Sequence, residues 1–258
     1  MKFLRLSLNI FSEFKSLIIV FCILIISIFS YFTYVRNYKI IDFLETRNKS
    51  LIEQYHVIYE NLRVLSENTF YGIINKQIIS DSIKDIQKNE DKEDEYRQKL
   101  YSDFLSDYER IKLYKFNIVN FYFKDNRVFL RMHQPNEFGD KSERYGLINS
   151  NSDLKPIDGY EIGKYFDAFR FIYPIYDKDL NHIGSVEIGI PSKYFEEKFE
   201  ETHNIDVHFL TKTDILKDNL KGNIFSEYKT STENNIYSYH EQLDEKNHYT
   251  NENFFTNN

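Results

Sequence analysis

An arginine and a histidine two positions apart, Arg131 and His133, are the residues of this sequence best suited to bind a small acid. Side chains two positions apart on a β-strand point to the same face of its sheet. A guanidinium group offers a planar fork of N–H donors to a carboxylate, and a neighbouring imidazole can donate or accept a hydrogen bond. The pair could therefore bind a small organic acid. The alternative is that Arg131 forms a buried structural ion pair with Glu161 or Glu187.

Three further residues are candidates for the same ligand-binding site: Glu161, Arg170 and Tyr173. Glu161 lies between two glycines and could accept a hydrogen bond from a ligand amine, or hold Arg131 or Arg170 in place. Arg170 alternates with two phenylalanines, so it is expected to face away from them. Tyr173 precedes a proline, which would end regular pairing at an edge or a bulge.

Strict alternation along Arg127–His133 predicts one face that forms a pocket wall and one that forms core. The pocket wall would comprise Arg127, Phe129, Arg131 and His133, and the core face Val128, Leu130 and Met132. Asp140 follows a glycine nearby and is interpreted as a residue that caps a turn rather than a ligand contact.

The strands that must position these residues lie within Asn117–Ile190. Two runs rich in aromatic and β-branched residues are separated by Asp125 and Asn126, which predicts a β-hairpin. A second hairpin is predicted from Phe169–Tyr176 and His182–Ile190 across a polar loop. These four strands predict a small antiparallel sheet with one covered and one concave face. The segment between the hairpins holds the densest glycine and proline content and is interpreted as a functional or disordered loop.

The run Leu17–Val35 contains no charged residue and is long enough to cross a bilayer core of roughly 30 Å. A cleaved signal peptide is the rival interpretation, but the apolar run is too long and no small-residue cleavage pattern follows it. Lysines and arginines flank both ends, so charge does not decide the orientation. The single cysteine, Cys22, lies in this run, so the rest of the chain has no thiols.

Apolar residues then recur in steps of three and four, which is a heptad pattern. Its members are Ile41, Leu44, Asn48, Leu51, Tyr55, Ile58, Leu62 and Leu65. Asn48 falls on the same heptad position as Ile41, where a buried asparagine fixes the register of paired helices. The pattern predicts a parallel homodimer. The alternative is that the stripe packs on its own chain, and both can hold at different levels of one helix.

The remaining segments predict a second helix, a third helix and one more strand. Residues 80–95 are rich in charge and are interpreted as a solvated loop or the start of a helix. Apolar spacing from Tyr96 to Ile111 predicts a helix with a core face. Ser192 could cap a helix that ends near His203, and Ile205–Leu210 reads as a strand.

Composition and motifs exclude several classes of function. The 258 residues carry a net charge of −7 without a basic stripe, which argues against nucleic-acid binding. His240, Asp244 and His248 could ligate a metal if helical, but an aspartate stands where a zinc protease motif needs its second histidine. No phosphate-binding glycine loop or nucleophile elbow occurs. We therefore expect no catalysis, no metal and no cofactor, and an exported hydrolase is the least favoured function.

Several ordered blocks within about 75 residues resemble one group of double-Cache sensory domains. The blocks are Phe129–Pro135, Gly139-Asp140, Gly159–Gly163, Arg170, Tyr173-Pro174 and His182–Gly189. Such domains form the extracytoplasmic ligand-binding part of bacterial chemoreceptors, sensor histidine kinases and diguanylate cyclases. The resemblance implies an α+β fold with a long N-terminal helix and two stacked PAS-like modules. It also implies that the N-terminal tail is cytoplasmic.

Together these features predict five segments. They are a cytoplasmic tail (1–15), a transmembrane helix (16–35), a long helical region (36–115), a PAS-like ligand-binding module (116–203), and an incomplete second module or disordered tail (204–258). The resemblance implies that a complete receptor would continue through HAMP and output segments, so the chain is expected to be truncated or to act through a partner.

The function expected on this basis is that of a single-pass, homodimeric sensor in the inner membrane. Its sensor domain would lie in the periplasm or outside the cell and would bind a small molecule such as an organic acid or amino acid. The alternative is a structural or interaction protein with a coiled-coil dimer and no small ligand.

Overall fold

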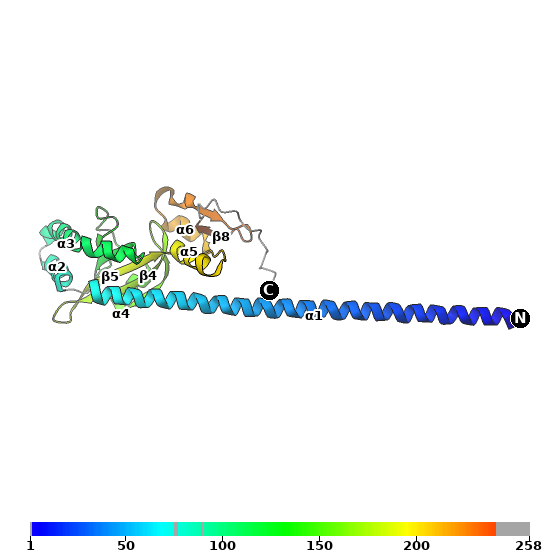
Figure 1. Cartoon of the computed structure of the whole chain (residues 1–258). Coiled ribbons are helices and arrows are strands. Elements are labelled where there is room, and N and C mark those ends of the chain that lie inside the picture. The colour runs from blue at the N-terminus through cyan, green and yellow to red at the C-terminus, as the bar shows by residue number, and fades with distance from the viewer. Residues whose placement is uncertain (1, 75–76, 89, 241–258) are drawn as a thin grey trace. The chain divides into compact units, whose positions relative to one another are not determined.

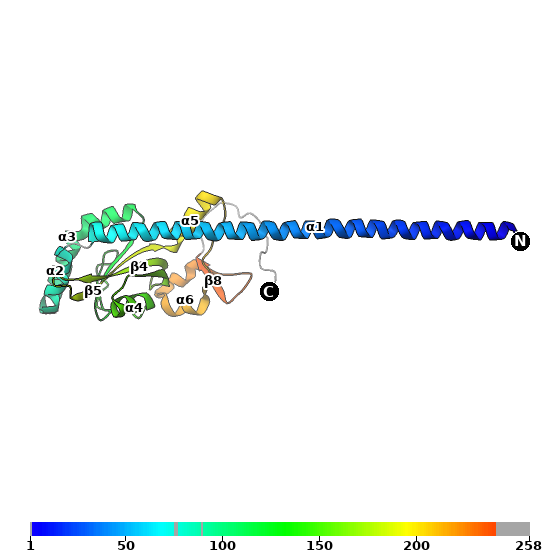
Figure 2. The ribbon, with the colours of Figure 1, turned by 90° about the horizontal axis from the view of Figure 1, so that it is seen from below.

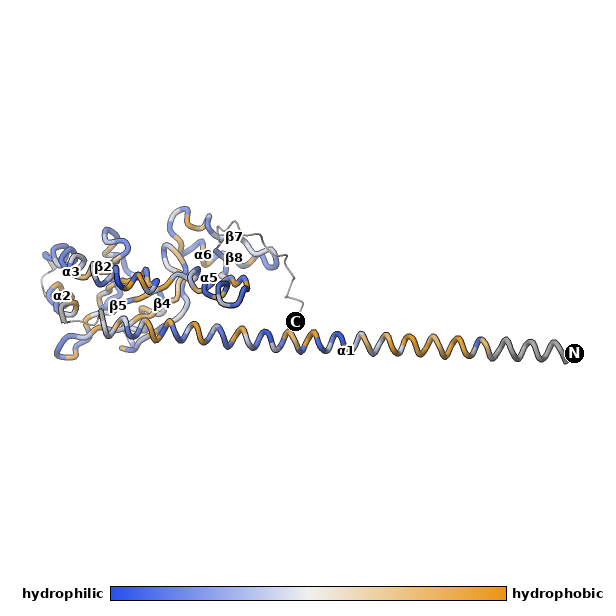
Figure 3. The backbone as a smooth tube through the Cα atoms, in the orientation of Figure 1, coloured by the Kyte–Doolittle hydropathy of each residue, from blue (hydrophilic) through white to orange (hydrophobic). Residues whose placement is uncertain are grey.

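The computed structural model describes residues 2–74, 77–88 and 90–240, which belong to two compact units, residues 1–60 and 61–258 (Figure 1). Most of helix α1 (Lys2–Thr69) forms the first unit. Apolar residues dominate α1 between Leu17 and Val35 (Figure 3), and the helix is long and apolar enough from Leu17 onward to cross a membrane. The predicted transmembrane segment therefore lies inside one continuous helix.

The heptad residues of α1 differ in exposure between its two ends. Ile41 and Leu44 are exposed, whereas Leu62, in the second unit, is buried. The interpretation that the stripe packs on its own chain is therefore confirmed for Leu62. The parallel homodimer stays a prediction for the preceding turns.

The second unit is built on a five-stranded antiparallel sheet with the order β2-β1-β5-β4-β3. Its strands are β1 (Ile118–Phe123), β2 (Val128–Arg131), β3 (Ile157–Ile162), β4 (Asp167–Tyr176) and β5 (His182–Pro191). Strands β4 and β5 run side by side over their whole length (Figure 2). Both predicted hairpins and the α+β fold class are confirmed, whereas β3 was not predicted.

One face of this sheet, here called the helix face, packs against helices. The helical elements that follow α1 are η1 (Phe70–Ile74), α2 (Gln77–Lys88), η2 (Glu90–Lys92) and α3 (Glu93–Leu113). Phe104 of α3 meets Phe121 of β1 edge to face, with 5.6 Å between ring centroids. Phe70 stacks on Tyr173 of β4 at 4.5 Å, and the Tyr173 hydroxyl shares a 2.5 Å hydrogen bond with Ser66. Aromatic burial of this kind supplies much of a core's stability.

The opposite face, here called the cavity face, carries polar side chains. Register places Asn120 of β1 opposite both Arg131 of β2 and Glu187 of β5, so the three side chains share this face. Arg170 of β4 also belongs to it, because Phe169 and Phe171 alternate to the helix face. The predicted orientation of Arg170 is therefore confirmed.

Two predictions about local structure were wrong, and a third was right only in part. The segment predicted as a long loop contains helix α4 (Tyr145–Asp153) and strand β3. The charged stretch at 80–95 contains the start of α3, as one of its two interpretations had it, but it also includes most of α2, whose Ile83 and Ile86 are buried. Residues 205–210 form no strand, because the chain runs through irregular backbone after α5 (Ser192–His203).

Helix α5 ends at His203 as predicted, but Ser192 does not cap it. The Ser192 hydroxyl instead donates to Asp167, a buried carboxylate that also receives the hydroxyls of Tyr160 and Tyr228. Buried carboxylates need such partners to offset the loss of water.

Residues 211–240 form a small three-stranded sheet with the order β6-β8-β7. Its elements are β6 (Thr211–Lys212), α6 (Thr213–Asn219), η3 (Gly222–Glu227), β7 (Tyr228–Thr230) and β8 (Tyr237–His240). Leu216, Leu220 and Tyr228 form its buried cluster, against which Ile162 of β3 packs. Residues 211–240 therefore pack beside β3, which is an edge strand of the main sheet.

Gly184 of β5 provides a test of the sheet. A Cβ atom there would lie 2.1 Å from the backbone oxygen of Tyr122, whereas a Cβ on Gly159 of β3 would meet nothing within 4 Å. Since backbone cannot move aside cheaply, Gly184→Ala should lower the free energy of unfolding by about 2 kcal/mol or more. Gly159→Ala is the matched control and should change it little. Urea unfolding of both variants checks this, and equal stability would contradict the pairing of β1 with β5.

Candidate ligand-binding site

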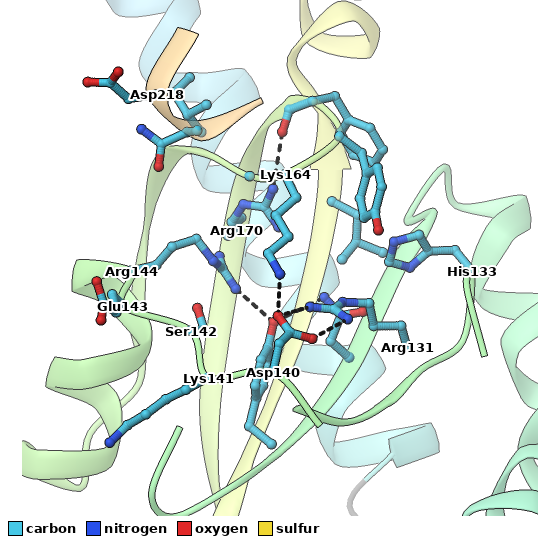
Figure 4. Close-up of a pocket in the computed structure, with 18 residues that line it drawn as sticks. Arg131, His133, Asp140, Lys141, Ser142, Glu143, Arg144, Lys164, Arg170 and Asp218 are labelled. Carbon is cyan, nitrogen blue, oxygen red and sulfur yellow. Dashed lines mark hydrogen bonds and ion pairs between the residues drawn. The ribbon is translucent and has the colours of Figure 1, made fainter. Parts of the chain in front are cut away.

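A cavity of about 450 Å³ opens on the cavity face of the main sheet (Figure 4). This volume is typical of small-molecule sites. Its lining comes from β1, β2, the connection between β2 and α4, the turn between β3 and β4, β4 itself, and the end of α6. The cavity is therefore built from segments distributed over most of the second unit.

Arg131 extends into this cavity and holds Asp140 in a two-pronged ion pair. Its two terminal nitrogens each donate to one Asp140 carboxylate oxygen at 2.9 Å, and one of them also donates to the Glu137 carbonyl at 2.7 Å. Lys164 donates to the same carboxylate at 2.5 Å. The hydrogen bonds from Arg131, followed by that from Lys164, hold the pKa of Asp140 well below its usual range. Arg131 and Lys164 therefore already stabilise one ionised carboxylate, that of Asp140, inside this cavity.

Glu187 is the buried centre of the polar side chains on this face. It has no solvent exposure and accepts hydrogen bonds from Arg144, Arg170 and the Tyr122 hydroxyl. Burial alone would raise its pKa, but the two guanidinium groups outweigh that effect and lower the pKa of Glu187 to about 2. Burial, together with the carboxylate, raises the pKa of Tyr122 to about 12. The carboxylate therefore stays ionised and the phenol stays protonated.

Arg144 connects this centre to helix α4. It precedes the first residue of α4 and donates to Glu161 of β3 at 3.0 Å as well as to Glu187. The second Glu161 oxygen accepts the backbone N–H of Gly146 at 2.7 Å. A carboxylate at a helix N-terminus is favourable because it satisfies free N–H groups there. Glu161 thus anchors α4 under the cavity.

His133 lines the cavity as predicted, and its environment keeps it neutral. Burial lowers the pKa of His133 to about 4. Its ring lies 6.4 Å from the ring centroids of Tyr165 and Phe166. Its Nδ1 atom has no hydrogen-bond partner among the residues that the structure describes. A neutral imidazole with a free nitrogen can serve a ligand as donor or acceptor.

Ion pairs join most of the charged groups around the cavity. Four cationic groups share three carboxylates: Arg131, Arg144, Lys164 and Arg170 with Asp140, Glu161 and Glu187. The lining also includes Lys141, Glu143 and Asp218, so the formal charges of the whole set balance. Any preference for an anionic ligand therefore depends on the local guanidinium groups and not on the net charge of the cavity.

The structure brings together three of the five predicted ligand-binding residues. Arg131, His133 and Arg170 line the cavity, whereas Glu161 and Tyr173 are not among the residues that line it. Glu161 is occupied by Arg144 and Gly146, and Tyr173 lies on the helix face because it alternates with the cavity-facing positions of β4.

The predicted ion-pair partners of Arg131 were wrong. It pairs with Asp140, not with Glu161 or Glu187. The interpretation of Asp140 as a turn cap is corrected likewise, because its side chain reaches back to Arg131 and Lys164. Neither pairing has a sequence signal, since both depend on how the connection after β2 folds over the sheet.

The predicted faces of Arg127–His133 are confirmed for Arg131 and His133 but wrong for Val128 and Phe129, because the pairing of β1 with β2 contains an irregularity. Tyr122 pairs with Val128 and Phe121 with Leu130, which leaves Phe129 without an opposite residue. Such a bulge breaks the two-residue alternation. Val128 therefore packs with Tyr122 on the cavity face, while Phe129 lies 5.2 Å from the Phe123 ring and under Arg97 of α3.

Several cavity residues were missed from the sequence. They are Asn120 and Tyr122 on β1, Lys141, Ser142, Glu143 and Arg144 before α4, Lys164 after β3, and Asp218 and Asn219 on α6. Period-two alternation places Asn120 and Tyr122 on one face of β1, so polar residues within that apolar strand were the available signal. Contacts from α6 could not be found by local reasoning.

Among the residues that the structure describes, no group of three or more histidine, cysteine, aspartate or glutamate side chains could hold a metal ion. The candidate ligands Asp244 and His248 lie outside the described residues, and His240 is at their boundary.

No protein-family model matches the sequence, and no curated protein matches it. Solved structures with a similar fold include the sensor domain of DcuS from E. coli, at 12% identity and a TM-score of 0.43 over 55% of this chain and 96% of that one. Another is the sensor domain of the V. cholerae histidine kinase DctB, at 8% identity and 0.42 over 60% and 58% of the two chains.

A third similar structure is the ligand-binding domain of Mlp24 with asparagine, at 12% identity and a TM-score of 0.32 over 63% of this chain and 70% of that one. These proteins are sensor or ligand-binding domains by their own descriptions. Because the TM-scores are below 0.5, the function of this chain must be argued from its own cavity.

His133 gives the site a pH dependence that can be measured. Its folded-state pKa of about 4 lies below the unfolded value of 6.5, so the unfolded chain binds the proton more readily as pH falls. This contribution to stability is complete at pH 7 and is lost as pH falls from about 6.5 to 4. Between pH 7 and pH 5 it amounts to roughly 2 kcal/mol. Urea unfolding, monitored by the circular dichroism of the tyrosines, measures the free energy of unfolding at each pH. From pH 7 to pH 5 this free energy should fall less for His133→Gln than for the parent chain.

Between pH 7 and pH 8 the free energy of unfolding should change with pH equally in the two proteins, which serves as the internal control. An identical loss of stability in both proteins between pH 7 and pH 5 would contradict the partly buried, neutral state of His133.

Proposed function

We propose that this chain is a membrane-anchored extracytoplasmic sensor that binds a small carboxylate-bearing molecule in the cavity on its main sheet. The observation that carries the proposal is the Arg131 fork, which lies in a cavity of about 450 Å³ and already holds a carboxylate. A guanidinium fork binds carboxylates through paired, charge-assisted hydrogen bonds. A ligand carboxylate can therefore take the place of Asp140.

The exchange is favourable because Asp140 keeps a second partner. When a ligand takes the Arg131 fork, the Asp140 carboxylate can stay on Lys164, which now donates to it at 2.5 Å. Asp140 is thus an internal competitor that keeps Arg131 paired until a ligand arrives.

Strand β4 provides a path from the cavity to the end of α1. Arg170 lines the cavity, and Tyr173, three residues further along, contacts Ser66 and Phe70 on the opposite face. A ligand that favours one arrangement of the sheet and its loops would shift this end of the helix by an ångström or two. In a homodimer, each α1 would then move relative to its mate and transmit the signal.

The anchor is the apolar part of α1. The run from Leu17 onward could span the inner membrane once, which would place residues 1–15 in the cytoplasm and the second unit in the periplasm or outside the cell. The heptad pattern and exposed apolar positions such as Ile41 suit a parallel homodimer. These exposed positions also suit the second candidate function, an interaction protein with a coiled-coil dimer and no small ligand.

Thermal-shift measurements on the full chain in detergent distinguish the two functions. We expect some carboxylic acids or amino acids to stabilise the chain, and amines without a carboxylate to have no effect. Arg131→Gln should weaken binding of a stabilising acid about tenfold to hundredfold, because a charge-assisted pair is lost.

Arg127→Gln is the matched control, since Arg127 pairs with Glu93 of α3 and does not line the cavity. It should leave the affinity unchanged, and circular dichroism should show both variants folded. Failure of every acid and amino acid to stabilise the parent chain would reject the sensor and favour the interaction protein. Equal effects of the two substitutions would reject the Arg131 site.

A further inference from the structure

Asn120 of β1 has a buried carbonyl oxygen that the protein leaves without a hydrogen bond. The side chain is only 4% exposed and lines the cavity. Its Oδ1 atom has no partner among the residues that the structure describes. Leaving a buried acceptor unpaired costs about 1–3 kcal/mol. A residue that bears this cost inside a ligand cavity is a candidate for a ligand contact.

The orientation of the amide follows from its neighbours. The Asn120 Nδ2 atom faces the Glu187 carboxylate at 3.5 Å and the Tyr122 hydroxyl oxygen at 3.2 Å. An ionised carboxylate can only accept hydrogen bonds, so the amide must present its N–H side to Glu187. The Tyr122 hydroxyl already donates its proton to Glu187, so it accepts from the amide as well. The carbonyl oxygen is therefore the group left for a ligand.

Asn120 is also placed next to the carboxylate site. It pairs directly with Arg131 across the β1–β2 ladder. Side chains that oppose each other in this way have Cβ atoms about 4.5–5.5 Å apart. A ligand whose carboxylate occupies the Arg131 fork would thus bring the atoms adjacent to that carboxylate within reach of the Asn120 oxygen.

We infer that the ligand is a carboxylic acid that carries a hydrogen-bond donor beside its carboxylate, which Asn120 Oδ1 accepts while Arg131 holds the acid. This inference rests on the proposed function and identifies its ligand class. The donor is a hydroxyl in a 2-hydroxy acid or an ammonium in an amino acid. An acid without such a donor would leave the Asn120 oxygen buried and unpaired, so it should bind less tightly.

The test uses the full chain in detergent and two sets of acids. The acids of each set share a carbon skeleton and differ in the group beside the carboxylate. The first set is propionate, lactate and alanine, and the second is glutarate, 2-hydroxyglutarate and glutamate, with both enantiomers of each chiral acid. In at least one set, titration calorimetry should show the hydroxy or amino acid binding about tenfold or more tightly than the acid without a donor. Comparison within a set tells a hydroxyl ligand from an ammonium ligand.

Substitution then assigns the effect to Asn120. Asn120→Leu keeps the side-chain shape without the acceptor and should bring the tighter acid to the affinity of its parent. Asn117→Leu is the matched control, because Asn117 directly precedes β1, is exposed and does not line the cavity. That variant should keep the preference. The comparison of acids on the parent chain needs no variant, so misfolding cannot obscure it.

The outcomes separate this inference from the function beneath it. If acids bind but those with and without the donor bind equally, the role of Asn120 is overturned and the carboxylate sensor stands. If the preference persists in Asn120→Leu, another residue accepts the donor and the inference fails. If no acid binds the parent chain, the proposed function and this inference fall together.

Discussion

The cavity depends on one buried ionic interaction, in which the carboxylate of Glu187 is shared by Arg144 and Arg170. A fully buried carboxylate is stable only when hydrogen bonds and opposite charge offset its lost hydration, and the guanidinium groups and the Tyr122 hydroxyl supply both. The interaction ties β5 to β4 and to the start of α4, so it fixes three sides of the cavity at once. Because Arg144 also pairs with Glu161, the two arginines are matched by two carboxylates. Removing Glu187 would therefore disturb the shape and the charge of the cavity together.

In the proposed sensor, the two faces of the same sheet have different roles. Polar residues on the cavity face would bind the ligand, while aromatic residues on the helix face contact the end of α1. Strand β4 takes part in both, through Arg170 on one side and Tyr173 on the other. Because a strand is stiff and its side chains alternate, a displacement of its backbone is felt on both faces. The arrangement thus offers a short physical link between an occupied cavity and a helix.

Local sequence patterns predicted the hairpins, α3, α5 and the orientation of Arg170 away from Phe169 and Phe171, since these depend on spacing and turn chemistry within a few residues. They did not predict the bulge opposite Tyr122, and this one extra residue exchanged the faces of Val128 and Phe129. Ion-pair partners were missed for a different reason. Arg131 reaches Asp140 only because the connection after β2 folds back over the sheet, and α6 reaches the cavity from far along the chain. Such pairings are tertiary contacts without a periodic signal.

The central claim is that the Arg131 fork is a carboxylate site occupied by Asp140 until a ligand takes its place. A structure of the full chain bound to the acid that stabilises it most would test this directly. The account predicts the ligand carboxylate on both terminal nitrogens of Arg131, with Asp140 released from Arg131 and held by Lys164, and with Glu187 still between its two arginines. A structure in which the acid is bound elsewhere while Arg131 and Asp140 stay paired would contradict it.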